Sequence, residues 1–244
     1  MVTKLSDRVV RLGSRYVNWY LVEDGGRVTV VDAGASGYRD QLGPGCRELG
    51  LGEGDVAAVV LTHAHSDHVG VAESLRTELG VPVLVHAADE ELARTGKPNG
   101  KNEGSSLPYL RHAMAWRLIW ELGRNGALKV RPIGEVRTFE DGEELDVPGR
   151  LRVVHTPGHT DGHSAFVAEA AGVVFAGDAI CSMNPLTGAD GPQLMPAPLT
   201  RNTEEALASL ERLGALDGQL LPGHGDALED AEAAAAEAKR RGPT

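Results

Sequence analysis

The chain has 244 residues, of which 41% are hydrophobic and 24% are charged, a composition typical of a globular protein that builds a real core. It carries 24 basic and 35 acidic residues, a net charge of −11, and has no block of Lys and Arg. Because nucleic acid binding needs clustered positive charge, we expect no nucleic acid partner. The two cysteines, Cys46 and Cys181, lie far apart, which excludes a disulfide framework.

Residues 1–16 contain no apolar run of signal-peptide length, and no later segment is long enough to cross a bilayer. We therefore expect a cytoplasmic protein with reduced thiols and no membrane partner. The acidic balance favours solubility and says little about function.

The first part of the chain has the pattern of strands. Short β-branched runs separated by turn residues predict strands within 8–13, 17–24 and 27–34. The continuous apolar run at 55–62 predicts a strand buried on both faces, and 81–86 predicts another. Between them, apolar residues at helical spacing and a final glycine, Gly80, predict a helix within 69–80.

The pattern changes at about residue 88. Residues 105–123 read "SSLPYLRHAMAWRLIWELG", which predicts a helix that is apolar on most of its circumference and carries Trp116 and Trp120. No linker marks a domain boundary. We therefore expect one domain over 1–244, with a helical insertion at about 88–130 and a long loop at about 181–200.

Strand patterns return after the insertion, at 136–145, 151–158, 164–170, 172–178 and 219–225. The Pro- and Gly-rich stretch at 181–201 has no clear periodicity and is long for a simple connection. Asn202 is placed to cap a helix over 202–214, and the Ala-rich segment 230–241 predicts an exposed terminal helix. Strands following strands in each half, with helices between them, predict an α/β (α+β) fold of stacked sheets covered by helices.

Four of the predicted strands end in a turn that carries His or Asp. The first of these turns reads "THAHSDHVG" and holds His63, His65, Asp67 and His68. The other three turns carry His155, His159 and His163, then Asp178, then His224. Loops at strand ends present functional groups, and imidazole and carboxylate are the ligands that zinc-type cations prefer. A single histidine at a strand end usually serves the structure, but four such turns indicate a metal site.

The spacing within the first turn is informative. His63 and His65 lie two residues apart, so on extended backbone their side chains share one side. Asp67 and His68 are adjacent and point in different directions. One short loop could therefore serve two neighbouring metal positions.

These residues resemble the metallo-β-lactamase-fold superfamily, whose signature is a His-x-His-x-Asp-His loop followed by turns with single ligands. The motifs occur in order over most of the chain. The resemblance implies a four-layer αββα sandwich of two mixed sheets with two divalent metal ions, Zn²⁺ in the first place and Fe or Mn otherwise, in a cleft at one sheet edge. It also implies ligands at seven positions, all of them filled here. His63, His65 and His159 would hold one ion, Asp67, His68 and His224 the other, and Asp178 would bridge both.

Such a centre predicts a metal-dependent hydrolase. Coordination sites left open mark a catalytic centre, and a metal ion lowers the pKa of bound water from 15.7 to about 7. The bridging hydroxide would attack an ester-, thioester- or lactone-type bond of a small molecule, and Asp67 would act as the catalytic residue that orients the hydroxide and shuttles its proton.

The motifs define the substrate less well than the chemistry. A β-lactam hydrolase is one alternative, although such secreted enzymes carry a signal peptide and usually lack an aspartate at the position of Asp178. The other alternative is a persulfide dioxygenase-like oxidoreductase with one iron, which would use part of this ligand set. A non-catalytic binding module would show a degraded ligand set, which this chain does not.

The helix at 107–123, with Met114, Trp116 and Trp120, and the loop at 181–200, with Met183 and Met195, are predicted pocket walls suited to an acyl or lactone group. A core or homodimer contact is the equal alternative for the tryptophan helix.

Further polar residues have two interpretations each. His163, His155 and Asp32 either orient the ligands or satisfy turn backbone. For His86, His112 and Cys181 we expect structural roles, although His112 could face the cleft and Cys181 could lie near the metals.

Overall fold

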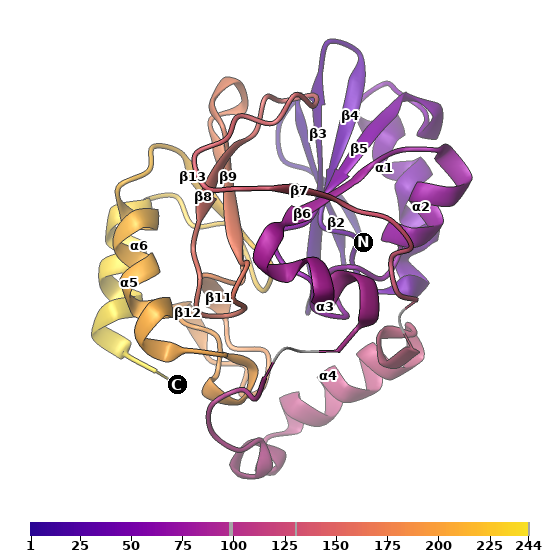
Figure 1. The fold of residues 1–244 in the computed structure, drawn as a ribbon. Helices are drawn as coiled ribbons and strands as arrows, with labels where there is room; N and C mark the ends of the chain where they lie inside the picture. Colours follow the sequence, from indigo (N-terminus) through magenta and orange to yellow (C-terminus); the bar gives the residue numbers. More distant parts are fainter. Residues whose placement is uncertain (98–99, 130, 244) are drawn as a thin grey trace.

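Two β-sheets pack face to face in the computed structural model, which describes residues 1–97, 100–129 and 131–243 (Figure 1). The larger sheet has the strand order β1-β2-β3-β4-β5-β6-β7 among these residues. The pairs β1–β2, β2–β3 and β3–β4 are antiparallel, whereas β4–β5, β5–β6 and β6–β7 are parallel. The strands are β1 Val2–Lys4, β2 Val9–Gly13, β3 Asn18–Asp24, β4 Arg27–Val31, β5 Val56–Val60, β6 Val83–His86 and β7 Arg137–Phe139.

The smaller sheet has the order β13-β10-β9-β8, with β10 and β13 parallel and the other pairs antiparallel. Its strands are β8 Arg152–His155, β9 Ser164–Ala168, β10 Val173–Gly177 and β13 Gln219–Pro222. The predicted strand at 136–145 is shorter than expected. Only β7 joins a ladder, because the chain turns at Gly142, whose φ is +80°, and returns to pair Glu144 with Arg152.

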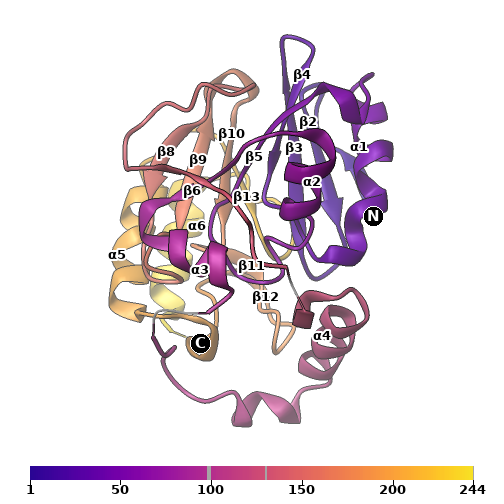
Figure 2. The ribbon, with the colours of Figure 1, turned by 45° about the vertical axis from the view of Figure 1, so that its right-hand side comes forward.

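Helices cover the outer faces of both sheets (Figures 1 and 2). On the larger sheet lie α1 Leu42–Glu48 and α2 Ala72–Leu79, and on the smaller one lie α5 Thr203–Gly214 and α6 Ala231–Arg241. Large apolar side chains of the two inner faces form the core between the sheets, including Val31 and Val60 on one side and Phe166 and Phe175 on the other. The predicted αββα sandwich is confirmed.

Local signals place the ends of these helices well. The side chain of Asn202 accepts hydrogen bonds from the backbone N–H groups of Glu204 and Glu205 at 3.1 and 3.2 Å, which is the predicted cap of α5. The prediction of an exposed terminal helix was wrong for one face of α6. Four alanines of α6, at 231, 234, 235 and 238, are buried in the cluster that includes Leu210 and Leu213 of α5, because their small side chains allow close approach of the two helices.

Where the structure describes it, the segment between β6 and β7 contains short helices and 3₁₀ turns joined by irregular stretches. It contains α3 Glu90–Thr95 and α4 Ala113–Arg124, whereas residues 98–99 and 130 of the predicted insertion lie outside the described residues. The predicted helix over 105–123 is divided, because His112 has an extended backbone (φ −91°, ψ 130°) between the 3₁₀ turn Leu107–Arg111 and α4. In both ribbon views α4 lies at the lower edge of the molecule (Figures 1 and 2).

The segment 181–200 is more ordered than a long loop. β11 Cys181–Met183 and β12 Asp190–Gln193 pair as an antiparallel hairpin, and a short 3₁₀ turn follows at Ala197–Leu199. The remaining 3₁₀ turns are Ser36–Gln41, Glu53–Asp55, Ala87–Asp89, Ala127–Lys129 and Glu169–Ala171. Within the described ranges, every helix falls short of the length and apolarity that a membrane span would need.

Candidate metal centre

Turns from both sheets meet at one edge of the sandwich. The turn after β5 carries the first cluster of histidines, and the turn between β8 and β9 carries His159. Asp178 follows β10 and His224 follows β13. Because β10 and β13 are parallel, their carboxyl ends lie at the same edge. The topology therefore brings together side chains from four separate places in the sequence.

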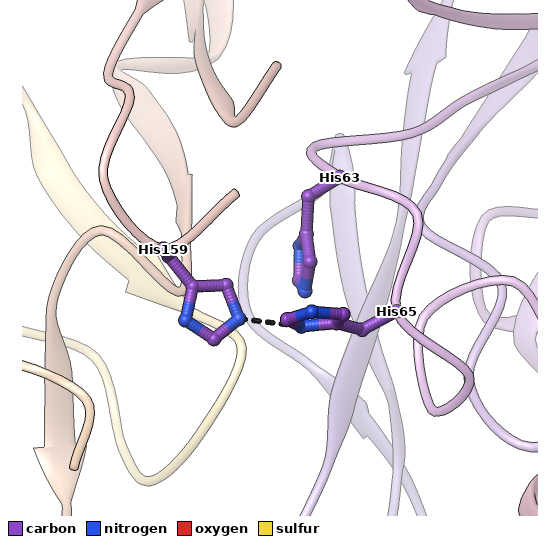
Figure 3. A group of neighbouring side chains, drawn as sticks. All are labelled: His63, His65 and His159. Carbon is purple, nitrogen blue, oxygen red and sulfur yellow. Dashed lines mark hydrogen bonds between the residues drawn. The ribbon is translucent and has the colours of Figure 1, made fainter. Parts of the chain in front are cut away.

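Three groups of side chains in this cluster have ligand atoms within 4.8 Å of one another. The groups are His63, His65 and His159; His63, His68 and Asp178; and Asp67, His68 and His224. Together they contain all seven residues named from the sequence. Ligand atoms about 2.1 Å from a common ion lie roughly 3 to 4 Å apart, so each group is close to the spacing that a cation needs. Figure 3 shows the first group, with the three rings converging and His65 Nδ1 at 2.7 Å from His159 Nε2.

Asp178 lies at the centre of the cluster. Its Oδ2 atom is 3.1 Å from His224 Nε2, 3.3 Å from His159 Nε2 and 3.9 Å from His63 Nε2. Its Oδ1 atom is 3.6 Å from His68 Nε2. One carboxylate thus faces histidines of all three groups, as a bridging ligand would.

Several buried atoms of the cluster have no hydrogen-bond partner among the described residues. They are His63 Nε2, His68 Nε2, His159 Nδ1 and Asp178 Oδ1. A buried polar atom without a partner costs about 1–3 kcal/mol, so four in one place need an explanation. Bound cations would satisfy three of these atoms, namely Nε2 of His63, Nε2 of His68 and Oδ1 of Asp178, whose residues all belong to the ligand groups. The donor set therefore fits divalent metal ions.

Neighbouring groups orient the imidazoles. The Nδ1 atom of His68 lies 3.0 Å from Asp32 Oδ2, and that of His63 lies 3.0 Å from Thr62 Oγ1. Thr62 Oγ1 donates to Asp32, so it accepts from the His63 ring. His224 Nδ1 contacts the carbonyl oxygen of Tyr16. In each ring Nδ1 is the donor, which leaves Nε2 directed at the cluster.

The electrostatics of the cluster favour the protonation states that bind metal ions, namely neutral imidazole and ionised carboxylate, for most of its residues. Burial, strengthened by the neighbouring imidazoles, lowers the pKa of His63 and His159 well below the ordinary value, so both rings are neutral at pH 7. Burial opposes ionisation of Asp178, but His224 and His68 outweigh it and hold the pKa of Asp178 well below its usual range.

His68 differs from these rings. Burial would lower its pKa, but the carboxylates of Asp178 and Asp32 outweigh burial and raise it to about 10. Without a metal ion the raised pKa favours the doubly protonated ring, whose proton on Nε2 a cation binding there would displace.

The predicted orienting residues divide into two kinds. Asp32 contacts His68, and His163 Nε2 accepts a hydrogen bond from the backbone N–H of Asp178 at 2.9 Å. His155 instead stacks on His86, with ring centroids 4.1 Å apart, and bonds the carbonyl oxygen of Asp161. Sequence reasoning missed Thr62, which contacts His63, and Thr156, whose Oγ1 lies 2.8 Å from His163 Nδ1. Isolated threonines at strand ends give no sequence signal.

The residues with expected structural roles have them. His86 accepts a hydrogen bond from the backbone N–H of Ala88 and begins the 3₁₀ turn after β6. His112 marks the start of α4 and does not line the cavity beside the cluster. Cys181 is fully buried and directs Sγ at the carbonyl oxygens of Gln193 and Leu194 across the hairpin.

A cavity of about 670 Å³ opens beside the cluster. His65, Asp67, His159, Asp178 and His224 line its polar end. Its apolar wall contains Leu92, Leu118, Leu122, Leu128, Met195 and Leu199.

The prediction that the tryptophans form the pocket wall was wrong. Trp116 and Trp120 are 57% and 62% exposed, because α4 turns Leu118 and Leu122 toward the cavity and the tryptophans toward solvent. Met195 lines the cavity as predicted, whereas Met114 and Met183 do not. Met183 is buried in the core. The homodimer contact proposed for this helix stays a prediction.

Fold and cluster together define a protein of the metallo-hydrolase class. A family model, "Metallo-beta-lactamase superfamily", matches residues 12–224, and the chain belongs to that superfamily. The probable metallo-hydrolase YflN of Bacillus subtilis is 29% identical over 186 residues, covering 72% of this chain and 67% of that protein. The hydroxyacylglutathione hydrolase GloC of Haemophilus influenzae is 28% identical, covering 65% of this chain and 63% of that protein.

Solved structures agree with the fold. The metallo-β-lactamase family protein TTHA1429 of Thermus thermophilus is 30% identical with a TM-score of 0.69, covering 98% of this chain and 80% of that chain. TTHA1623 in a di-iron-bound form is 30% identical with a TM-score of 0.59, covering 90% and 92%. The metallo-β-lactamase SMB-1 is 20% identical with a TM-score of 0.70, covering 99% and 93%, and at this identity the likeness shows the fold alone.

Proposed function

We propose that this protein is a dinuclear metal-dependent hydrolase that cleaves an ester, thioester or lactone bond in a small molecule. The observation that carries the proposal is the arrangement of three ligand groups linked by shared residues, His63 and His68. In this proposal His63, His65 and His159 hold one ion, and Asp67, His68 and His224 hold the other. Asp178 bridges them, since its two oxygens face histidines of all three groups.

When bound, two divalent cations supply a hydroxide nucleophile at neutral pH and polarise the scissile carbonyl. The side chains of the site orient the reacting groups. Asp67, whose side chain is 17% exposed at the cavity, has Oδ2 at 3.8 Å from His224 Nε2 and 3.9 Å from His68 Nε2. It is therefore placed to hold the attacking group and to carry its proton to the leaving group.

Zn²⁺ is the proposed ion because His-rich sites with carboxylate ligands suit it. The di-iron form of TTHA1623 supports iron as the alternative. The apolar wall of the cavity favours a substrate with an acyl chain, and the similarity to GloC supports a thioester as the bond. Cleavage of a β-lactam is the second candidate, based on the shared fold.

A substrate panel with metal exchange tests the proposal. We expect protein stripped by a chelator to be inactive, and protein reloaded with two equivalents of Zn²⁺ to hydrolyse an acyl-glutathione thioester or a long-chain lactone. The panel also includes a cephalosporin and a phosphodiester. For each preparation the metal content is determined and oxygen uptake is measured with an oxygen electrode. Cleavage of the cephalosporin alone would favour the second candidate. One iron per chain with oxygen uptake on a persulfide would overturn the hydrolase proposal.

Leu122→Ala tests the apolar wall. Leu122 lines the cavity from α4, and trimming it removes methylenes that are each worth about 0.8 kcal/mol when buried. We expect kcat/KM for the longest acyl substrate to fall about tenfold, with little change for an acetyl substrate. Ile119→Ala is the matched control, because Ile119 lies on the same helix and is 43% exposed. Equal losses for long and short substrates would contradict an acyl-binding wall.

A further inference from the structure

Asp89 is a buried carboxylate outside the ligand set. It ends the 3₁₀ turn Ala87–Asp89 directly after β6 and is 2% exposed. No Lys or Arg in the described part of the chain forms an ion pair with it. A buried charge without a cation is costly unless hydrogen bonds compensate it, so the partners of Asp89 indicate its role.

Its partners are donors next to the ligands of the first group. Asp89 Oδ2 accepts from the backbone N–H of Ala64 at 3.1 Å and from Thr160 Oγ1 at 2.8 Å. Oδ1 accepts from the backbone N–H of Gly162 at 2.8 Å. Ala64 stands between His63 and His65, and Thr160 follows His159. Each histidine of that group is therefore adjacent to a donor that Asp89 holds.

The two loops that Asp89 joins belong to different sheets. Residues 61–68 follow β5 of the larger sheet, and residues 156–163 connect β8 and β9 of the smaller one. The contact is close, since a Cβ at Gly162 would lie 2.6 Å from the backbone nitrogen of Asp89 and 2.8 Å from its Cγ. Glycine at position 162 thus permits the carboxylate to reach both loops at once.

We propose that Asp89 is a positioning residue that holds the His63, His65 and His159 rings at the spacing of one metal site. The proposal rests on the proposed function, because it assumes that these rings bind a metal ion. Hydrogen bonds to an ionised carboxylate are about twice as strong as neutral ones, which suits Asp89 to join loops that no continuous ladder connects. Asp89 does not line the 670 Å³ cavity, so we assign it an effect on the ligands rather than on the substrate.

Asp89→Asn tests this role. Asparagine keeps the shape but turns one acceptor oxygen into a donor, which must face either Gly162 N–H or the pair formed by Ala64 N–H and Thr160 Oγ1. We expect the Zn²⁺ dissociation constant of chelator-stripped protein, measured by competition with a chromophoric chelator, to rise about tenfold. The rise in melting temperature on adding Zn²⁺ should shrink accordingly, since that rise follows the metal affinity.

Two further variants separate positioning from folding. Thr160→Val removes one of the three donors at constant shape and should raise the dissociation constant by a smaller factor. Asp141→Asn is the control, because Asp141 accepts from the backbone N–H of His155, the last residue of β8, at 2.8 Å and pairs with Arg212, but it accepts no hydrogen bond from residues 61–68 or 156–163. It should lower the melting temperature equally with and without Zn²⁺.

The outcomes are distinct. If Asp89→Asn lowers the melting temperature equally with and without Zn²⁺, at unchanged metal affinity, Asp89 only stabilises the fold and the proposal is wrong. Should Asp89→Asn fail to fold, an unchanged metal affinity in folded Thr160→Val overturns it. If the unmodified protein binds no Zn²⁺, Mn²⁺ or Fe²⁺, the proposed function fails first, and this proposal fails with it.

Discussion

Replacing Asp178 with alanine is expected to abolish hydrolysis while leaving the protein folded. The carboxylate faces four histidines of the cluster, and its removal deprives both proposed ions of their common ligand. A metal ion contributes several kcal/mol of charge stabilisation to such a reaction, and each 1.36 kcal/mol is tenfold in rate. We therefore expect kcat/KM to fall by a factor on the order of a thousand or more, and metal analysis to give less than the unmodified stoichiometry.

The fold should survive this change because the turn after β10 uses the backbone of residue 178. Its N–H donates to His163 Nε2, and alanine retains that bond. Far-ultraviolet circular dichroism checks the fold. Asp7→Ala, at a side chain that is 98% exposed, is the control and should retain full activity. Unchanged turnover in folded Asp178→Ala would remove Asp178 from the site.

Gly223→Ala is expected to disrupt the metal centre by displacing two of its proposed ligands, Asp178 and His68. A Cβ at position 223 would lie 2.1 Å from Asp178 Oδ1 and 2.7 Å from His68 Cε1, which is closer than atoms can approach. Both side chains are buried and cannot move aside freely. We expect a loss of at least about a hundredfold in kcat/KM together with weaker metal binding, because misplacement by about 1 Å has that effect on catalytic groups.

Gly54→Ala is the matched control for this prediction. A Cβ at Gly54 would meet no atom within 4 Å, so the same change should leave activity and metal content as they are. If Gly223→Ala were to bind metal and turn over substrate normally, the close packing of the Asp178 and His68 side chains would have no role in the centre.

The strands and their order along the chain could largely be predicted from local patterns. The run at 55–62 is apolar from Val56 to Leu61 because β5 lies inside the sandwich, and four of the five residues of β5 are buried. The hairpin of β11 and β12 at 181–193 could not be predicted in this way. Its pairing depends on register between residues that have no alternating pattern, and that register shifts between Cys181 and Met183.

The orientation of α4 also escaped prediction. The charged residues Arg117, Glu121 and Arg124 mark one side of the helix and so indicate which side turns inward, but they do not decide whether the flanking tryptophans face the cavity or solvent. Tertiary contacts decide it, since Leu118 joins the core while Trp116 donates its indole N–H to the carbonyl oxygen of Leu110 at the surface. Asp89 gave no signal either, because it begins a run of three acidic residues that reads as an ordinary helix start.

The sequence by itself determined which ligand-type residues the chain owns and that each follows a strand, since residue type and strand periodicity are local properties. The tertiary structure alone decided that they meet. His224 lies beside Asp178, 46 residues away, and contacts the carbonyl oxygen of Tyr16, 208 residues away. Such contacts depend on how two sheets pack, because burial of their shared apolar faces determines which turns become neighbours, and no short stretch of sequence records that packing.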